Sequence, residues 1–159
     1  MTDHAIAALN SPSWRQRIEA LRAALGRFPL ALLQLLFRFS IAAVFWNSGM
    51  TKLASWQTTI VLFRDEYRVP VLPPELAATL AASVELTCPV LLVLGLGARL
   101  ATLPMLGMTF VIETFVYPQD WIEHLGWASF LLFILTRGPG LLSLDHVIAR
   151  RFLGDGKRP

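Results

Sequence analysis

Four runs of apolar residues dominate the pattern of hydrophobic and polar positions along this chain. They cover residues 29–49, 76–95, 100–116 and 121–136. The first two hold 21 and 20 residues, the length that an α-helix needs to cross a bilayer, whereas the fourth is shorter and begins with Glu123 and His124. Pro89 lies inside the second run and predicts a kink there. The pattern predicts an all-α fold, an integral membrane four-helix bundle.

The segment before the first run has a different pattern. Apolar residues recur there at spacings of three and four, at Trp14, Ile18, Leu21, Leu25 and Phe28, while arginines lie off this stripe. A basic helix of this kind suits the surface of an anionic cytoplasmic leaflet, and it equally suits packing against the base of the bundle. We expect residues 1–28 to form a cytoplasmic, interfacial amphipathic helix, with Ser11 as its N-cap.

Composition and charge agree with a membrane protein. Of the 159 residues 55% are hydrophobic and 16% are charged, which favours one small helical membrane domain. The net charge of +3 does not indicate a nucleic-acid partner, because the basic residues flank apolar runs and form no patch interleaved with aromatics. The single cysteine, Cys88, excludes a disulfide within the chain and therefore two-thiol redox chemistry.

The charges between the runs predict an orientation. Ten basic residues fall on one side of the four spans, against three on the other, Lys52, Arg64 and Arg68. The ten are Arg15, Arg17, Arg22, Arg27, Arg99, Arg137, Arg150, Arg151, Lys157 and Arg158. The excess marks the cytoplasmic side, so both termini should lie there. Residues 29–159 then form the transmembrane domain, with a short cytoplasmic helix after the fourth span.

The longest connection, residues 50–75, would lie outside the cytoplasm. Its apolar residues recur at helical spacing after Ser55, which is a good N-cap residue, and Pro70 follows. We expect a short amphipathic helix along the outer surface.

Polar side chains inside the spans are the candidate site. Arg38 and Glu85 each lie near the middle of an apolar run, where an ionised group costs on the order of 2.5–3.5 kcal/mol, so we expect them to pair. By depth alone, Lys52 and Glu113 would form a second pair. Asn47 is a further polar candidate in the first span. These groups either line a pocket for a small polar or quinone-like ligand or only lock the helices in register.

Three stretches resemble landmarks of the DoxX family: 45–53 (FWNSGMTKL), Glu85-Leu86 leading to 94–99 (LGLGAR), and 138–145 (GPGLLSLD). The segments 51–59 and 69–75 resemble one branch of it. The resemblance implies a small four-helix protein of the bacterial cytoplasmic (inner) membrane. Matched position by position, the family landmarks are Arg38, Gly49, Lys52, Glu85, Arg99, Gly138, Pro139, Gly140 and Asp145.

The resemblance implies less about function than about fold. The family takes its name from a subunit linked to a quinone-reducing, thiosulfate-oxidising complex, and relatives are associated with thiol and oxidative-stress systems. We interpret the chain as a subunit of a redox or stress-response membrane assembly. Quinone contact is the sharper hypothesis, with the ring among Phe37, Phe45 and Trp46. A non-enzymatic anchor or assembly partner, or a small-solute or proton pathway through Glu85 and Glu113, are the alternatives.

No self-contained catalytic centre is visible in the sequence. Haem would need paired axial ligands, and only His124 lies near a span. Iron–sulfur clusters need sets of cysteines, and zinc sites need Cys and His at short spacings. We therefore predict no haem, iron–sulfur or metal site. Catalytic residues stay unassigned, and any redox centre would belong to a quinone or to a partner. We expect the chain to associate with a protein partner in the membrane or with a second copy of itself.

Overall fold

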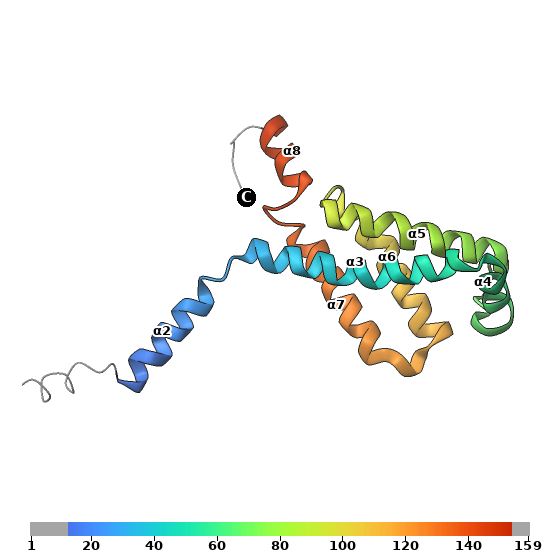
Figure 1. The fold of residues 1–159 in the computed structure, drawn as a ribbon, viewed down its shortest axis with the longest axis horizontal. Helices are drawn as coiled ribbons and strands as arrows, with labels where there is room; N and C mark the ends of the chain where they lie inside the picture. The colour runs from blue at the N-terminus through green and yellow to red at the C-terminus, as the bar shows by residue number, and fades with distance from the viewer. Residues whose placement is uncertain (1–12, 154–159) are drawn as a thin grey trace, which may run out of the picture. The chain divides into compact units, whose positions relative to one another are not determined.

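The computed structural model describes residues 13–153, and every regular element in this part is helical (Figure 1). The elements are α2 (Trp14–Gly26), α3 (Leu30–Ala54), α4 (Trp56–Leu62), η1 (Phe63–Tyr67), α5 (Pro74–Leu94), α6 (Ala98–Val111), η2 (Ile112–Val116), η3 (Pro118–Asp120), α7 (Trp121–Arg137) and α8 (Leu144–Leu153). The chain divides into two compact units, Met1–Leu30 and Ala31–Pro159. Each unit is described by itself.

The first unit contains α2, which begins with a capping box. The Ser13 side chain accepts from the backbone of Gln16, and the Gln16 side chain accepts from the backbone of Ser13 at 2.8 Å. The expected Ser11 cap lies outside the described residues. No residue of α2 is buried, and its apolar stripe is exposed, with Trp14 at 68% and Leu25 at 67%.

Three helices of the second unit are long and apolar enough to cross a membrane. They are Leu30–Ala54, Pro74–Leu94 and Ala98–Val116, the last combining α6 with η2. Helix α7 has 17 residues and packs against α6. The first helix continues past the predicted end at Gly49 to Ala54, since nothing between Met50 and Leu53 interrupts a helix. This extension carries Lys52 onto α3.

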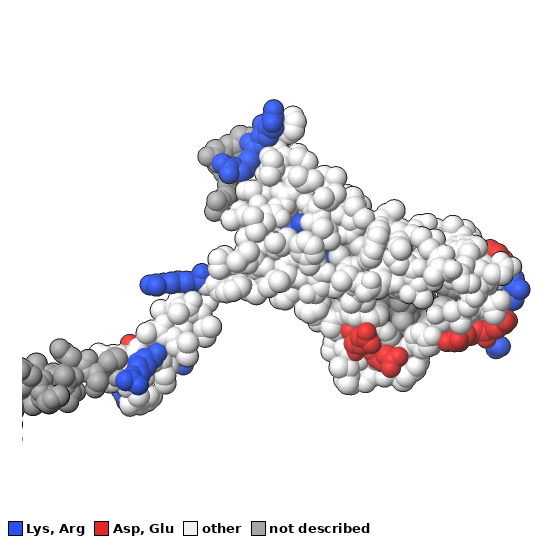
Figure 2. Space-filling model, viewed as in Figure 1, with Lys and Arg blue, Asp and Glu red and all other residues white. Residues whose placement is uncertain are grey.

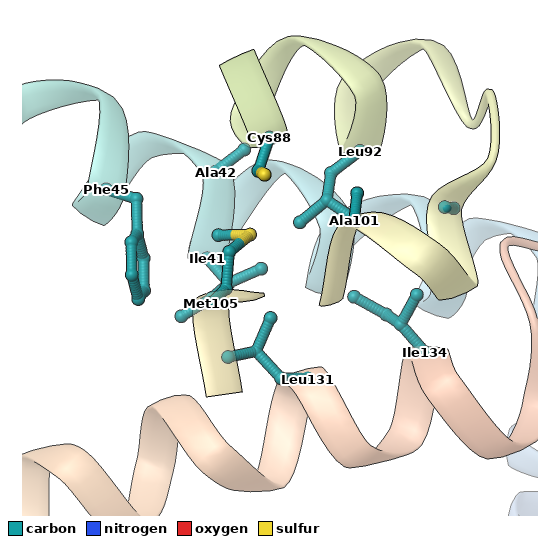
Figure 3. Packing of buried hydrophobic residues seen from close by; sticks show 10 residues of the cluster. Ile41, Ala42, Phe45, Cys88, Leu92, Ala101, Met105, Leu131 and Ile134 are labelled. Carbon is teal, nitrogen blue, oxygen red and sulfur yellow. The ribbon is translucent and has the colours of Figure 1, made fainter. Parts of the chain in front are cut away.

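Residues from α3, α5, α6 and α7 share one hydrophobic core. Ile41 and Phe45 come from α3, Leu92 from α5 and Met105 from α6, and Leu131 and Ile134 of α7 point towards them (Figure 3). Ile41, Leu92, Met105, Leu131 and Ile134 are completely shielded from solvent. The core therefore joins helices that are far apart in the sequence.

Gly49 sets the spacing of α3 and α5. A Cβ atom at Gly49 would lie 3.0 Å from Glu85 Cβ and 3.0 Å from the Leu86 side chain. A small residue at such a contact lets two membrane helices approach closely. The register that follows places the C-terminal half of α3 beside Glu85.

The connection after α3 contains the predicted short helix. Ser55 caps α4 as expected, accepting from the backbone of Thr58. The helix continues into η1, a turn of π-helix, and a second π-helical turn, η2, ends the third long helix. Phe63 of η1 packs with Ala77 and Ala78 of α5 in a second, smaller core. Because π-helical turns are rare and often occur at functional sites, η1 and η2 indicate where a functional site could lie.

Candidate functional site

Arg38 does not pair with Glu85, contrary to the prediction from depth. Its side chain is only 1% exposed and donates to four backbone carbonyls. Nε donates to Leu92 O at 2.5 Å and Nη2 donates to Val93 O. Nη1 donates to Pro139 O at 3.0 Å and to Leu142 O at 2.6 Å. The guanidinium therefore ties the end of α5 to the loop before α8.

Helix geometry explains this arrangement. The last carbonyls of a helix have no partner within it, and the positive guanidinium also suits the negative end of the helix dipole. Helix α3 extends five residues beyond Gly49, so Arg38 lies further from the middle of its helix than the apolar run suggested. In the register set by Gly49, Arg38 reaches Leu92 and Val93, and Glu85 lies about two turns away along α5.

The other landmarks near Arg38 also have structural roles. Asp145 accepts from the backbone of Gly97 at 2.8 Å and of Ala98 at 3.1 Å, which caps the start of α6. A Cβ atom at Gly95, whose φ is +66°, would lie 2.8 Å from Arg38 Nη2. We call Arg38, Gly95, Pro139 and Asp145 the Arg38 cluster. Three further landmarks border it: Arg99, which is exposed and donates to Thr136 O at 3.4 Å, and Gly138 and Gly140, both with positive φ.

Lys52 forms its ion pair with Glu85. Lys52 Nζ lies 2.8 Å from Glu85 Oε1, and their side chains are 14% and 3% exposed. Ser48, one turn before Lys52, donates to the same Oε1 at 3.0 Å and lies 3.0 Å from Lys52 Nζ. The second carboxylate oxygen, Glu85 Oε2, is buried and has no hydrogen-bond partner in the described part of the chain. Glu85 Oε1 therefore accepts two hydrogen bonds, whereas Glu85 Oε2 accepts none from residues 13–153.

Glu113 pairs with His124, so the expected pair of Lys52 with Glu113 is also wrong. His124 Nδ1 lies 2.6 Å from Glu113 Oε2, and the His124 side chain is only 5% exposed. The two residues stand on either side of the short turn between η2 and α7, where neighbouring antiparallel helices bring them together. The sequence held this signal, because a carboxylate and a histidine flank the Tyr117-Pro118 turn at similar distances.

The Lys52–Glu85 ion pair and His124 border one cavity of about 460 Å³. Lys52, Ser48 and Glu85 lie on its wall, as does His124, which is hydrogen-bonded to Glu113. The remaining wall is mostly apolar and includes Ala81, Val84, Met108 and Trp127. Both π-helical turns contribute, through Phe63 and Tyr67 from η1 and Ile112 and Val116 from η2. An apolar cavity with a few convergent polar groups has the form of a small-molecule site.

An aromatic contact joins the two π-helical turns beside this cavity. Tyr117 donates its phenolic O–H to Glu66 Oε1 at 2.6 Å, and its ring meets the edge of Tyr67 with centroids 5.8 Å apart. The hydrogen bond to the Glu66 carboxylate, followed by burial, raises the pKa of Tyr117 well above its ordinary value. We call Glu66, Tyr67 and Tyr117 the tyrosine clasp. Acidic side chains gather at this end of the second unit (Figure 2).

The DoxX family model matches residues 33–118, which is more than half of the chain. This chain belongs to the DoxX family. No curated protein and no solved structure matches it. The matched DoxX region includes Arg38, Lys52, Glu85 and Glu113, and it ends before His124 and Asp145.

Some residues predicted for the DoxX ligand site lie elsewhere. Asn47 is exposed and borders a separate groove with Phe39, Trp46 and Pro89. Phe37 stacks on Phe130 with ring centroids 5.1 Å apart. The prediction that a ring binds among Phe37, Phe45 and Trp46 therefore does not match the cavity. Residues that the sequence reasoning missed are Ser48, His124 and Trp127.

Proposed function

We propose that this DoxX protein is a subunit of a redox or stress-response assembly in the bacterial inner membrane and binds a quinone headgroup in the cavity beside Lys52 and Glu85. The observation that carries the proposal is a mostly apolar cavity of about 460 Å³ bordered by the Lys52–Glu85 ion pair and by His124, which is hydrogen-bonded to Glu113. Cavities of roughly 300–1,000 Å³ with few polar groups hold small molecules in other proteins. Its apolar walls suit a ring, and Lys52, Glu85 and His124 suit polar ring substituents.

The polar groups are suited to such a ligand. Lys52 Nζ carries three N–H groups and makes two contacts, to Glu85 and Ser48, which leaves one donor for a ligand oxygen. His124 binds Glu113 through Nδ1, so Nε2 is its other site for gaining or losing a proton. When bound, a quinone would supply the electron chemistry. The chain would bind the ring, orient it and exchange protons at its edge.

The proposal includes a topology. Helix α7 supplies Leu131 and Ile134 to the core shared with the three long helices, which supports a fourth span and a four-helix bundle in residues 29–159. An even number of spans places both termini on the same side, and the excess of basic residues favours the cytoplasm. Helix α2 then lies at the cytoplasmic surface, where its exposed apolar stripe meets the lipid interface.

Ligand binding can be measured on the purified protein in lipid nanodiscs. A short-chain benzoquinone should quench tryptophan fluorescence saturably, because Trp127 lines the cavity. Ala81→Leu places a larger side chain in the cavity and should weaken binding at least tenfold. Ala43→Leu is the matched control, since Ala43 is exposed and borders the separate groove. Equal weakening by both variants, or no saturable binding, would contradict the proposal.

The assembly can be tested separately. Affinity purification from native membranes in mild detergent should recover a redox protein in stoichiometric amount, because we predict no haem, iron–sulfur or metal site in this chain. A mock purification from the same membranes without the tagged chain is the control. Recovery of the chain alone, in a form that still binds the quinone, would contradict the proposed assembly but not the proposed ligand site.

A further inference from the structure

One oxygen of the Glu85 carboxylate points to the chemistry of the ligand. Oε1 accepts from both Lys52 and Ser48, whereas Oε2 is buried without any hydrogen-bond partner in residues 13–153. A buried carboxylate oxygen without a donor is costly, and such groups are uncommon in folded proteins. Glu85 is 2% exposed and lines the cavity. A molecule bound in the cavity lies beside Glu85 and can bring the missing donor to this carboxylate.

The ion pair with Lys52 makes Glu85 a carboxylate, which only accepts hydrogen bonds. The oxygens of a quinone also only accept, so a quinone cannot satisfy Oε2. A quinol or another phenol carries an O–H group that donates. Hydrogen bonds from O–H groups to a carboxylate are short and about twice as strong as neutral ones.

We infer that the cavity selects a hydroxyl-bearing aromatic molecule whose O–H donates to Glu85 Oε2. The inference rests on the proposed function, because it requires a ring in this cavity, and it narrows the ligand to the reduced, quinol-like form. The apolar wall from Val84, Met108 and Trp127 contacts the ring. A quinol and a phenol with no redox partner share this chemistry, and the experiment separates them.

The test compares four ligands of the same ring size on wild-type protein in nanodiscs under anaerobic conditions. They are a short-chain benzoquinol, its quinone, its dimethyl ether and an alkylphenol of equal chain length. The dimethyl ether keeps the ring and removes the donors, so no mutation is needed. The quinol should bind at least tenfold more tightly than the quinone and the ether.

Glu85→Gln gives a second, independent readout. The glutamine amide both donates and accepts, so the variant should bind quinol and quinone within about threefold of each other. Glu75→Gln is the matched control, because Glu75 lies on the same helix with its side chain 60% exposed. The control should keep the tenfold preference. If Glu85→Gln does not fold, the four-ligand comparison on the wild type decides the question.

The outcomes separate the inference from the proposed function. Tight binding of the quinol and the alkylphenol supports the hydroxyl contact. If only one of the two binds tightly, that one identifies the class of ligand that the cavity selects. Equal affinity for quinol, quinone and ether means that water satisfies Glu85, which overturns the inference and leaves the proposed site. Absence of binding by all four ligands overturns both.

Discussion

Replacing Arg38 by glutamine tests how much the buried guanidinium stabilises the fold. The variant removes the donors to Leu92, Val93, Pro139 and Leu142. Each buried carbonyl left without a donor costs about 1–3 kcal/mol. The bond to Leu92 is buried and the other three are partly buried, so water replaces some of them. Counting two carbonyls as unpaired gives about 4 kcal/mol.

A loss of about 4 kcal/mol lowers the folding equilibrium constant roughly a thousandfold. The measurement is reversible unfolding in mixed detergent micelles, followed by tryptophan fluorescence. Arg99→Gln is the matched control, because Arg99 is exposed and makes one bond of 3.4 Å, and it should change stability by less than about 0.5 kcal/mol. If Arg38→Gln lowered the free energy of unfolding no more than Arg99→Gln does, Arg38 would not hold the end of α5 to the loop before α8.

Two further changes test the ion pair and the tyrosine clasp. Lys52→Met leaves Glu85 as a buried charge without its cation and should cost about 3–5 kcal/mol in the same unfolding assay, whereas Lys52→Met with Glu85→Leu should recover most of this loss; failure to recover would mean that the pair is not the cause. Tyr117→Phe removes a phenol whose pKa is raised, so the stability that Tyr117 contributes is fully present below pH about 10 and is lost as the pH rises above that value. Ultraviolet titration of the folded protein should therefore show one late-ionising tyrosine that disappears in Tyr117→Phe, and an unchanged titration would contradict the clasp.

The sequence predicts the elements of this DoxX protein well. Run lengths locate the three long helices, and Ser55 marks the start of α4. The apolar periodicity also predicts the exposed stripe of α2. These features depend on local propensity, capping and hydrophobic pattern, and each of these can be read over one or two helical turns.

The pairing of the buried charges could not be read in this way. Apolar run length, the sequence's only measure of depth, ends the first span at Gly49, although the helix continues through Lys52. In the longer helix, Lys52 lies beside Glu85, and Arg38 lies beside the end of α5. Every residue has a backbone carbonyl, so the sequence does not reveal which carbonyls an arginine will bind. The register depends instead on the contact of Gly49 with α5.

The cavity is a product of three-dimensional packing. Its wall combines residues from α3, η1, α5, α6, η2 and α7, which are spread over most of the chain. The sequence marks Glu85 and Lys52 as candidates because charges are costly in a membrane. Ser48 and Trp127 carried no such signal, since a serine and a tryptophan are ordinary residues in a membrane helix.

The most direct test of the ligand cavity is photolabelling with a short-chain quinone analogue that carries a diazirine, followed by peptide mass spectrometry. The label should appear on α5 and η2 residues that line the cavity, such as Ala81 and Ile112, and an excess of unlabelled short-chain quinol should remove it. Label on Trp46 and Val90 in the separate groove, or label that quinol does not displace, would contradict binding beside Lys52 and Glu85.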